Sequence, residues 1–332
     1  MPAFGITDHL EGPRDQASAS IYAEVIEQTI IADRLGFQYA WFTEHHAHAH
    51  RGHLPAPSLL ALHLAGLTSR IRLGTAIICL NLHHPLAVAE QVAVADTLMK
   101  GRSAFGFGSG STPEEFALFG AHVTEERQRH LHFEAALRLM RSAWRGEIDR
   151  STGHLFSVPP HAPLPMAAPD LASRSWLAVN SAGSARIAGA LGFNMLYSHL
   201  RTPEQYCEYR TAYRSAGGAG LIAANRPVHV AKDDATAFSR IEPALRRLWR
   251  RFQAEGKIPA TTPEPRHAQD LCGHPINFIV GAPGRVARAL RDLHEESPYD
   301  VANVEVRWDG LTAPDIHDCL YRLAEVFDDA RF

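Results

Sequence analysis

The stretch RIRLGTAIICLNLHHPLAVAEQVAVADTLMKGRSAFGFGSG, residues 70–110, decides the fold class of this chain. Residues 70–80 and 103–110 are apolar runs with β-branched or aromatic side chains, which is typical of buried strands. Between them, residues 86–101 place apolar side chains on one side of a helix and end in a Lys-Gly pair that stops it. A strand, a crossover helix and a second strand in this order predict a parallel βαβ unit.

The same alternation continues on both sides of this unit. Further strands are expected at residues 4–7, 39–43, 176–180, 194–198, 226–231 and 301–307. Helices are expected at residues 20–35, closed by Gly36, around Leu59, at 125–144, at 184–191 and from residue 281 onward. Eight strands that alternate with helices predict an α/β fold, a single (β/α)8 TIM barrel over residues 1–332. Irregular insertions are expected at about 148–174 and 255–275, where proline is frequent and no period is visible.

The composition fits one large domain and argues against several other classes of protein. With 332 residues, 45% of them hydrophobic and 21% charged, the chain can bury a sizeable core without disulfides. Its four cysteines lie far apart and form no C-x-x-C pair, so neither a disulfide framework nor a thiolate metal site is indicated. A reducing cytoplasm is the expected location. The net charge of −3 argues against a nucleic-acid partner, and no apolar run is long enough to predict a membrane span.

A dense histidine run, WFTEHHAHAHRGH at residues 41–53, follows the second expected strand. In a barrel of this kind, the residues just after the carboxyl end of each strand line the mouth of the active site. Glu44 and His45 fall at that place. We therefore expect their side chains at the functional end of the barrel.

The same run contains a spacing that would suit a metal ion. His46, His48 and His50 are separated by single residues, so in an extended chain their imidazoles point the same way and could share one ion. A catalytic metal also needs ligands from other strand ends, which carry mostly small or hydroxyl residues apart from His199. We therefore expect no bound metal, and a metal-dependent hydrolase stays open as an alternative.

A second turn combines glycine with hydroxyl residues in the sequence NSAGSARIAGALG, residues 180–192. Asn180 ends an expected strand, and Ser181, Ala182 and Ser184 open the helix that follows. Small residues at such a turn let a phosphate approach the backbone amides at the helix N-terminus. Ser181 or Ser184 would equally serve as an ordinary helix cap, so both interpretations stay open.

Together these residues resemble the bacterial luciferase-like flavin-dependent monooxygenase family, a group of (β/α)8 barrels. The similarity lies in WFTEHH, in the central block at residues 70–102, in FGFGSG and EEFALFG, in VNSAGSARIAGALGFNM and in IVGAPGRVARAL, which occur in the family's order. These motifs extend over nearly the whole chain, and the central block is the most specific of them. The resemblance implies that the histidine run lines a pocket for FMN.

The resemblance also implies roles for particular residues, carried over by their position in the motifs. His45 would sit beside the flavin ring and assist the hydroperoxide chemistry, and Glu44 would brace the pocket. Ala76 and Ile77 match the position at which relatives carry a non-proline cis peptide under the isoalloxazine ring. The other residues implied to bind the cofactor are Gly108, Ser109, Arg127, Asn180, Ser181, Ala182 and Ser184. Among these, Arg127 matches an arginine that pairs with the FMN phosphate.

Two residues depart from the luciferase pattern. Ser109 stands where the luciferases have an arginine in the glycine turn, which removes a fork of donors suited to phosphate. This departure implies weaker flavin binding or reliance on Arg127 alone. His199 stands where luciferase has a tryptophan near the flavin, so the wall of the substrate pocket is changed and light emission from long aldehydes does not follow.

The function implied by the resemblance is that of a two-component flavin-dependent monooxygenase. A separate flavin reductase would supply reduced FMN, and O2 would add at C4a to give a peroxyflavin that oxidises a small organic substrate. No second nucleotide fingerprint is visible in the sequence, in line with an external reductase. A homodimer is also implied, through helices near the second and third strands that include the apolar segment LLALHLAGL at residues 59–67.

Three alternatives stay open at the level of the sequence. The first is a deazaflavin-dependent enzyme of the same fold that transfers hydride, although the Glu-His-His sequence at residues 44–46 favours the monooxygenases. The second is the metal-dependent hydrolase that would use the spaced histidines. The third is a flavin-binding protein without catalytic turnover.

Overall fold

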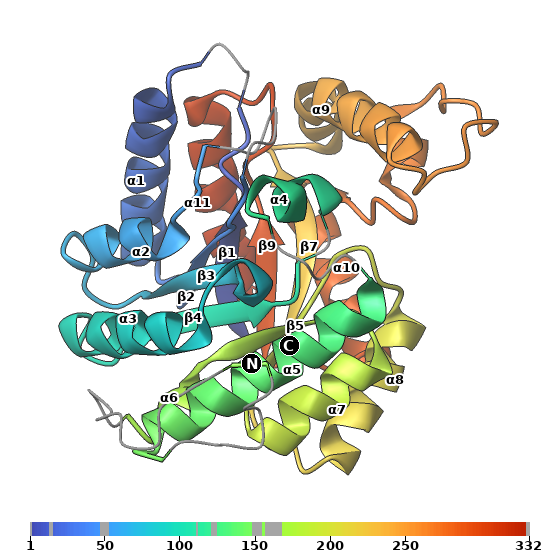
Figure 1. Ribbon diagram of the computed structural model, residues 1–332. Helices are drawn as coiled ribbons and strands as arrows, with labels where there is room; N and C mark the ends of the chain where they lie inside the picture. Colours follow the sequence, from blue (N-terminus) through green and yellow to red (C-terminus); the bar gives the residue numbers. More distant parts are fainter. Residues whose placement is uncertain are drawn as a thin grey trace.

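The computed structural model describes residues 2–12, 16–46, 53–110, 112–120, 125–147, 155–156 and 168–329. Eight parallel strands close into a barrel in the order β6, β5, β4, β3, β2, β1, β9, β7 and back to β6 (Figure 1). They are β1 (Ala3–Asp8), β2 (Tyr39–Phe42), β3 (Arg72–Cys79), β4 (Ser103–Gly108), β5 (Trp176–Val179), β6 (Asn194–Tyr197), β7 (Ile222–Val230) and β9 (Val301–Glu305). The predicted (β/α)8 barrel is confirmed.

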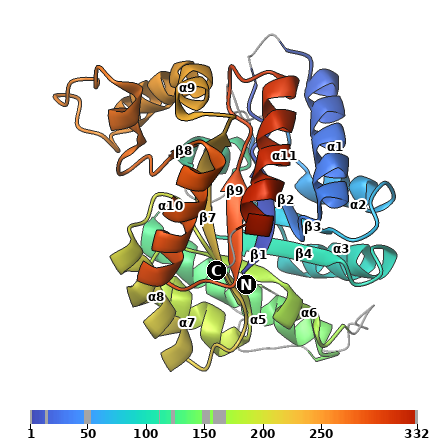
Figure 2. The same cartoon turned by 180° about the vertical axis from the view of Figure 1, so that it is seen from behind.

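Helices cover the outside of the barrel, apart from α4 (Pro113–Leu118), which lies at the carboxyl ends of the strands (Figure 1). They are α1 (Ser18–Leu35), α2 (Pro57–Ala65), α3 (Pro85–Leu98), α4 (Pro113–Leu118), α5 (Glu126–Trp144), α6 (Leu171–Arg174), α7 (Ala182–Leu191), α8 (Pro203–Ser215), α9 (Asp234–Ala254), α10 (Pro283–Glu296) and α11 (Ala313–Asp329). As predicted, Gly36 closes α1, and it takes the left-handed conformation with a φ of 91°. Figure 2 shows α1 and α11 side by side. The ring of Phe327 on α11 stacks on that of Phe4 on β1. Among the helices of the described residues, none is long and apolar enough for a membrane span.

Apolar side chains close the interior of the barrel toward the amino ends of the strands. Tyr39 and Trp41 stack with ring centroids 4.8 Å apart, and Trp176 meets both rings edge-on. The whole group consists of Tyr39, Trp41, Ala104, Trp176, Leu196, Ala223 and Val301. Because this end is filled, polar side chains gather at the opposite end, where the strands finish.

Two strand assignments made from the sequence were wrong in detail. The seventh strand, predicted at residues 226–231, is β7 and begins four residues earlier, at Ile222. A further strand, β8 (Ile279–Gly281), pairs in parallel with the end of β7 outside the ring of eight and was not predicted. Three residues are too short to show a strand period, and residue 281 was assigned to a helix that begins only at Pro283.

The two expected insertions differ in what the structure describes. The segment at residues 148–174 lies mostly outside the described residues, and its described end contains the short helix α6. The segment at residues 255–275 follows α9 and contains the 3-10 helix η3 (Ala268–Cys272) (Figure 1). It packs on α9 through an apolar cluster that includes Trp249, Leu271 and Trp308. Since Trp308 lies just after β9, this insertion is anchored at the carboxyl ends of the strands.

Candidate active site

A cavity of about 170 Å³ lies at the carboxyl ends of β2, β3, β4 and β5. Its wall contains six of the eleven residues predicted to form the site, namely Glu44, His45, Ile77, Gly108, Ser109 and Asn180. Thr43, Cys79 and Glu115 also line the cavity and were not predicted. Residues from four separate strand ends therefore meet at one place, as the geometry of a parallel barrel requires.

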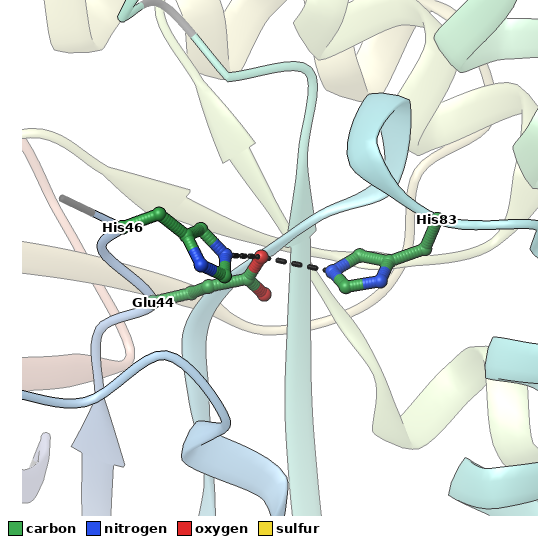
Figure 3. A group of neighbouring side chains, drawn as sticks. All are labelled: Glu44, His46 and His83. Carbon is green, nitrogen blue, oxygen red and sulfur yellow. Dashed lines mark hydrogen bonds and ion pairs between the residues drawn. The ribbon is translucent and has the colours of Figure 1, made fainter. Parts of the chain in front are cut away.

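Glu44 is the centre of a hydrogen-bonded group on this wall. Its side chain is buried, and its Oε1 atom accepts hydrogen bonds from Nε2 of His46 at 2.9 Å and from Nε2 of His83 at 2.8 Å (Figure 3). Its Oε2 atom accepts the backbone N–H of Cys79 at 3.3 Å. An ionised carboxylate only accepts hydrogen bonds, so both imidazoles carry a proton on Nε2. Glu44 thereby ties the segment after β2 to the segment after β3.

The same three side chains form a group that could hold a metal ion. The possible ligand atoms of Glu44, His46 and His83 all lie within 4.8 Å of one another. Hydrogen bonds alone account for this arrangement, since each imidazole directs an N–H at the shared carboxylate oxygen. His48 and His50, which the alternative metal site needs, lie outside the described residues.

His45 is held by Glu115 of α4. The Nδ1 atom of His45 lies 3.5 Å from Oε1 of Glu115, and the same oxygen accepts the backbone N–H of His46 at 2.9 Å. Burial raises the pKa of Glu115, but the hydrogen bonds from His45 and from the His46 amide outweigh this, so its pKa lies below the ordinary value. Glu115 is therefore ionised near neutral pH and favours a proton on Nδ1 of His45.

One wall of the cavity contains an irregularity in β3. The peptide bond between Ala76 and Ile77 is cis, at the position that the resemblance implies. The pairing of β3 with β4 shifts register between Thr75 and Ile78, on either side of this bond. A Cβ atom added to Gly108 would come within 2.7 Å of the Ile77 side chain. Gly108 therefore lets Ile77 lie against β4, which a larger residue would prevent.

The turn before α7 contains the helix cap that the sequence allowed as one interpretation. The Oγ atom of Ser181 accepts the backbone N–H of Ser184 at 3.2 Å. In return, Oγ of Ser184 accepts the backbone N–H groups of Ser181 and Asn180 at 3.1 and 3.2 Å. Both hydroxyls thus serve a capping box. Phosphate binding by the backbone amides of this turn stays a prediction.

Of the residues predicted to bind the cofactor, Ala76, Arg127, Ser181, Ala182 and Ser184 do not line the cavity. Arg127 is exposed in the first turn of α5. Ala76 is half-buried and packs against the apolar group that closes the barrel. Ser109 lines the cavity, and its carbonyl oxygen accepts a hydrogen bond from the side chain of Asn81 at 2.8 Å. The roles of these residues toward a cofactor stay predictions.

A second cluster of titratable groups lies on the opposite arc of the barrel mouth. Glu305, the last residue of β9, is fully buried, and its Oε1 lies 3.0 Å from Nδ1 of His199 and 3.4 Å from Nε2 of His9. Asn225 of β7 donates a hydrogen bond to the same oxygen. The ring of His9 stacks against that of His45 with centroids 5.9 Å apart, so this cluster adjoins the first. Only His199 was singled out from the sequence.

Comparisons with known proteins relate the chain to oxidoreductases. Residues 3–299 match the model of a family described as luciferase-like monooxygenase. The uncharacterized protein y4wF of Sinorhizobium fredii is 30% identical over 89% of this chain and 87% of its own length. The oxygenase component of a flavin-dependent trigonelline monooxygenase from Acinetobacter baylyi is 28% identical over 62% of this chain and 56% of its own length. An F420-dependent glucose-6-phosphate dehydrogenase from Beutenbergia cavernae is 27% identical over 58% of each chain.

Solved structures with the same architecture cover nearly the whole chain. The monooxygenase RslO1 from Streptomyces bottropensis superimposes with a TM-score of 0.80 at 23% identity, over 97% of this chain and 98% of its own. The oxygenating constituent of 3,6-diketocamphane monooxygenase from Pseudomonas putida, solved in complex with FMN, gives a TM-score of 0.77 at 19% identity, over 98% of this chain and 97% of its own. At these identities the likeness shows the fold alone.

Proposed function

This chain belongs to the luciferase-like monooxygenase family, and we propose that it is the oxygenase component of a two-component enzyme that oxidises a small organic substrate with reduced FMN and O2. One observation carries the proposal, namely the cavity at the strand ends. Its wall joins Glu44 and His45 to Ile77 of the cis peptide and to Asn180 before α7. The sequence resemblance assigns each of these residues to the flavin site.

The groups at this cavity suit a planar, phosphorylated ring system. The Oγ1 atom of Thr43 is buried and has no hydrogen-bond partner within the described ranges, so it can serve a polar edge of a ligand. The backbone amides in the first turn of α7, at Ala182 and Gly183, suit a phosphate because they point out of the positive end of the helix. The residues proposed to hold FMN are Ala76, Ile77, Gly108, Ser109, Arg127, Asn180, Ser181, Ala182 and Ser184.

The chain's own residues orient the substrate, exclude water and move protons. Bound reduced FMN would supply the two electrons that O2 needs before one oxygen atom passes to an organic molecule. His45 holds a proton at Nδ1 against Glu115, so Nε2 is the ring atom that takes or returns a proton at the reacting centre. Glu44 keeps the neighbouring wall in place through His46 and His83.

A flavin reductase is the proposed partner, since one relative is named as the oxygenase component of a flavin-dependent monooxygenase. The second candidate is a deazaflavin-dependent hydride transfer, because another relative is an enzyme of that type. The pair of neighbouring histidines, His45 and His46, supports the first candidate. All four cysteines are free, which suits the reducing cytoplasm in which we place the chain.

We further propose a homodimer formed through α2 and α3. Large apolar side chains are exposed on or just after these neighbouring helices, with Leu59 at 69%, Leu98 at 60% and Val94 at 45% exposure. Leu98→Glu should convert the dimer to a monomer, because it would place a charge in an apolar interface. Leu131→Glu on α5, where the leucine is 56% exposed, is the matched control and should leave the mass unchanged. Light scattering after gel filtration measures both, and a monomeric wild type would contradict the proposal.

Turnover with isotopically labelled O2 tests the proposed function. The chain, a flavin reductase, NADH and FMN are incubated with a panel of small organic compounds, and products are examined by mass spectrometry. We expect one labelled oxygen atom in the product, and His45→Ala should lower its rate of formation by about a hundredfold or more if His45 moves the proton. A product that forms with a reduced deazaflavin and without O2 would favour the second candidate and overturn the first.

A further inference from the structure

We propose that Glu305, His199 and His9 form the substrate subsite of this oxygenase, and that His199 takes the proton of an acidic substrate hydroxyl, a phenol or an enol. This inference rests on the proposed function, which it extends by a class of substrate. It starts from the second cluster at the barrel mouth, which the proposed flavin site does not use.

The three side chains come from strands that are far apart in the sequence and end at the same rim. Glu305 ends β9, His9 follows β1 directly, and His199 lies two residues after β6. His199 and His9 approach the same carboxylate oxygen, at 3.0 and 3.4 Å. Because the ring of His9 also stacks against that of His45, the cluster borders the place proposed for oxygen transfer. A substrate between the two groups would touch both.

A column of polar side chains inside the barrel holds the carboxylate from below. Asn303 donates a hydrogen bond to Oγ1 of Thr7 at 2.6 Å and another to Oδ1 of Asn225 at 3.3 Å. Asn225 in turn donates to Oε1 of Glu305. The column begins next to the apolar group that closes the barrel, and Glu305 lies at its end nearest the carboxyl ends of the strands. Glu305 is therefore a positioning residue, which fixes the imidazoles above it.

The protonation of His199 follows from its partner. Burial alone would raise the pKa of Glu305, but His199 and His9 hold it well below the ordinary value, so the carboxylate is ionised. A carboxylate only accepts, so Nδ1 of His199 carries the proton that faces Glu305, and Nε2 is the ring atom left to meet a ligand. This Nε2 atom is buried and has no hydrogen-bond partner in the part of the chain that the structure describes.

A buried acceptor without a partner is costly unless a ligand supplies a donor. The second oxygen of Glu305 is also buried without a described partner, although a purely structural ion pair would be expected to use both oxygens. Two arginines near the cluster are already engaged. Arg226 donates to the carbonyl oxygen of His199 and to Tyr206, and Arg307 is paired with Asp8 at 3.1 Å. Among the described residues of the cluster, the buried atoms without a hydrogen-bond partner are Nε2 of His199, Oε2 of Glu305 and both ring nitrogens of His9.

The chemistry of this pair selects the substrate class. When an acidic hydroxyl meets His199, its O–H bond breaks, the electron pair stays on the substrate oxygen, and the proton bonds to Nε2. The imidazolium that results is balanced by the carboxylate of Glu305. A phenolate or enolate is electron-rich at the neighbouring carbon, which is where an oxygen atom derived from O2, reduced by FMN, would be transferred. The oxygen enters the C–H bond of that carbon, and the other oxygen atom of O2 leaves as water with the two electrons and two protons that reduced FMN would supply. The oxygenated product takes the proton back from Nε2 before it leaves. Ketones, thioethers and alkenes have no such hydrogen to give.

Binding of 4-nitrophenol tests the proposal without turnover and without flavin. Its phenolate absorbs visible light and its phenol form does not, so the bound protonation state is read directly from the spectrum. We expect the full chain to bind it as the phenolate at a pH at which the free compound is still mainly a phenol. 4-Nitroanisole, which lacks the hydroxyl hydrogen, should bind about tenfold more weakly, the effect of one hydrogen bond.

Two variants test whether the phenolate spectrum depends on a base at position 199 and not on the shape of the site. His199→Gln keeps a hydrogen-bond acceptor but no base, so it should bind 4-nitrophenol without the phenolate absorption. His63→Gln, at an exposed position on α2, is the matched control and should behave as the wild type. Equal affinity for the two nitro compounds, or an unchanged phenolate spectrum in His199→Gln, would overturn the proposal. If His199→Gln does not fold, the two ligands compared on the wild type decide the question alone.

The experiments distinguish a failure of the proposed subsite from a failure of the proposed function. If 4-nitrophenol binds as the phenolate but reduced FMN does not bind, the subsite stands and the oxygenase proposal falls. If reduced FMN binds and the two nitro compounds bind equally, the subsite falls and the oxygenase proposal stands.

Discussion

Replacing Glu44 by alanine should destabilise the fold by an amount that can be worked out from its contacts. The carboxylate accepts from His46, whose side chain is 10% exposed, from His83, which is 36% exposed, and from the buried amide of Cys79. A buried donor left without a partner costs about 1–3 kcal/mol. The partly exposed imidazole of His83 can bond to water instead, so only the donors of His46 and Cys79 lose their partner. We therefore expect the free energy of unfolding to fall by about 4 kcal/mol. That is a large part of a typical stability of about 5–15 kcal/mol.

The assay is calorimetric unfolding at pH 7. With an unfolding entropy of about 2.1 cal/mol/K per residue, a chain of 332 residues changes its stability by about 0.7 kcal/mol per degree near the midpoint. The loss of about 4 kcal/mol should therefore lower Tm by about 6 °C. Glu44→Gln should lie between wild type and alanine, because its amide oxygen can still accept from both histidines while its NH2 group faces the amide of Cys79.

The matched control is Glu134→Ala, which removes an exposed ion pair with Arg138 one helical turn away. Such pairs contribute about 0.3–0.5 kcal/mol, so Tm should move by less than about 1 °C. A Tm of Glu44→Ala within about 1 °C of the wild type would refute the reasoning. It would mean that the carboxylate does not accept the three hydrogen bonds, or that they do not stabilise the folded chain.

Three further predictions concern the same framework. Gly74→Ala should abolish soluble folded protein, because its Cβ would lie 1.9 Å from the carbonyl oxygen of Ala104, whereas Gly273→Ala, with open space around it, should give a wild-type yield and circular dichroism spectrum. Burial opposes ionisation of Asp33, but hydrogen bonds from the amides of residues 69–71 lower its pKa. Its stabilisation is therefore present above about pH 4 and is lost as the pH falls further, so urea unfolding of Asp33→Ala and wild type should differ at pH 7 and converge in acid; a constant difference would contradict this. Treatment with a chelator should leave Tm unchanged, because Glu44 is held by imidazole N–H groups, and a drop in Tm would instead indicate a metal at that group.

Much of the fold could be predicted because apolar runs alternate with helical periods along the chain. Residues at the carboxyl ends of parallel barrel strands line one mouth, which predicted that Glu44, His45 and Asn180 lie at the same rim. The structure brings all three to the same cavity. The cis peptide at Ala76 and Ile77 came from the resemblance alone, since no local pattern distinguishes it from an ordinary strand. The short strand β8 was missed because pairing with β7, rather than its own sequence, makes it a strand.

The missed residues of the site reach it from unexpected positions. His83 follows the 3-10 helix η1 (Leu80–Leu82), and Glu115 lies in the first turn of α4, so neither directly follows a strand. Glu305 was hidden because its strand was expected to continue to residue 307, which made it an interior residue. Its alternation with Asn303 in a strand otherwise rich in valine was the available signal, because polar side chains two residues apart share one face.

Anaerobic titration with reduced FMN is the measurement that tests the central claim most directly. The account predicts saturable binding of one FMN per chain. Binding is measured through the quenching of tryptophan fluorescence. Ala178→Phe, which would put a ring into the cavity while leaving its proposed ligands in place, should weaken binding by at least about tenfold with an unchanged circular dichroism spectrum. No binding of reduced FMN, or equal affinity of the wild type and Ala178→Phe, would contradict the claim that this cavity holds the flavin.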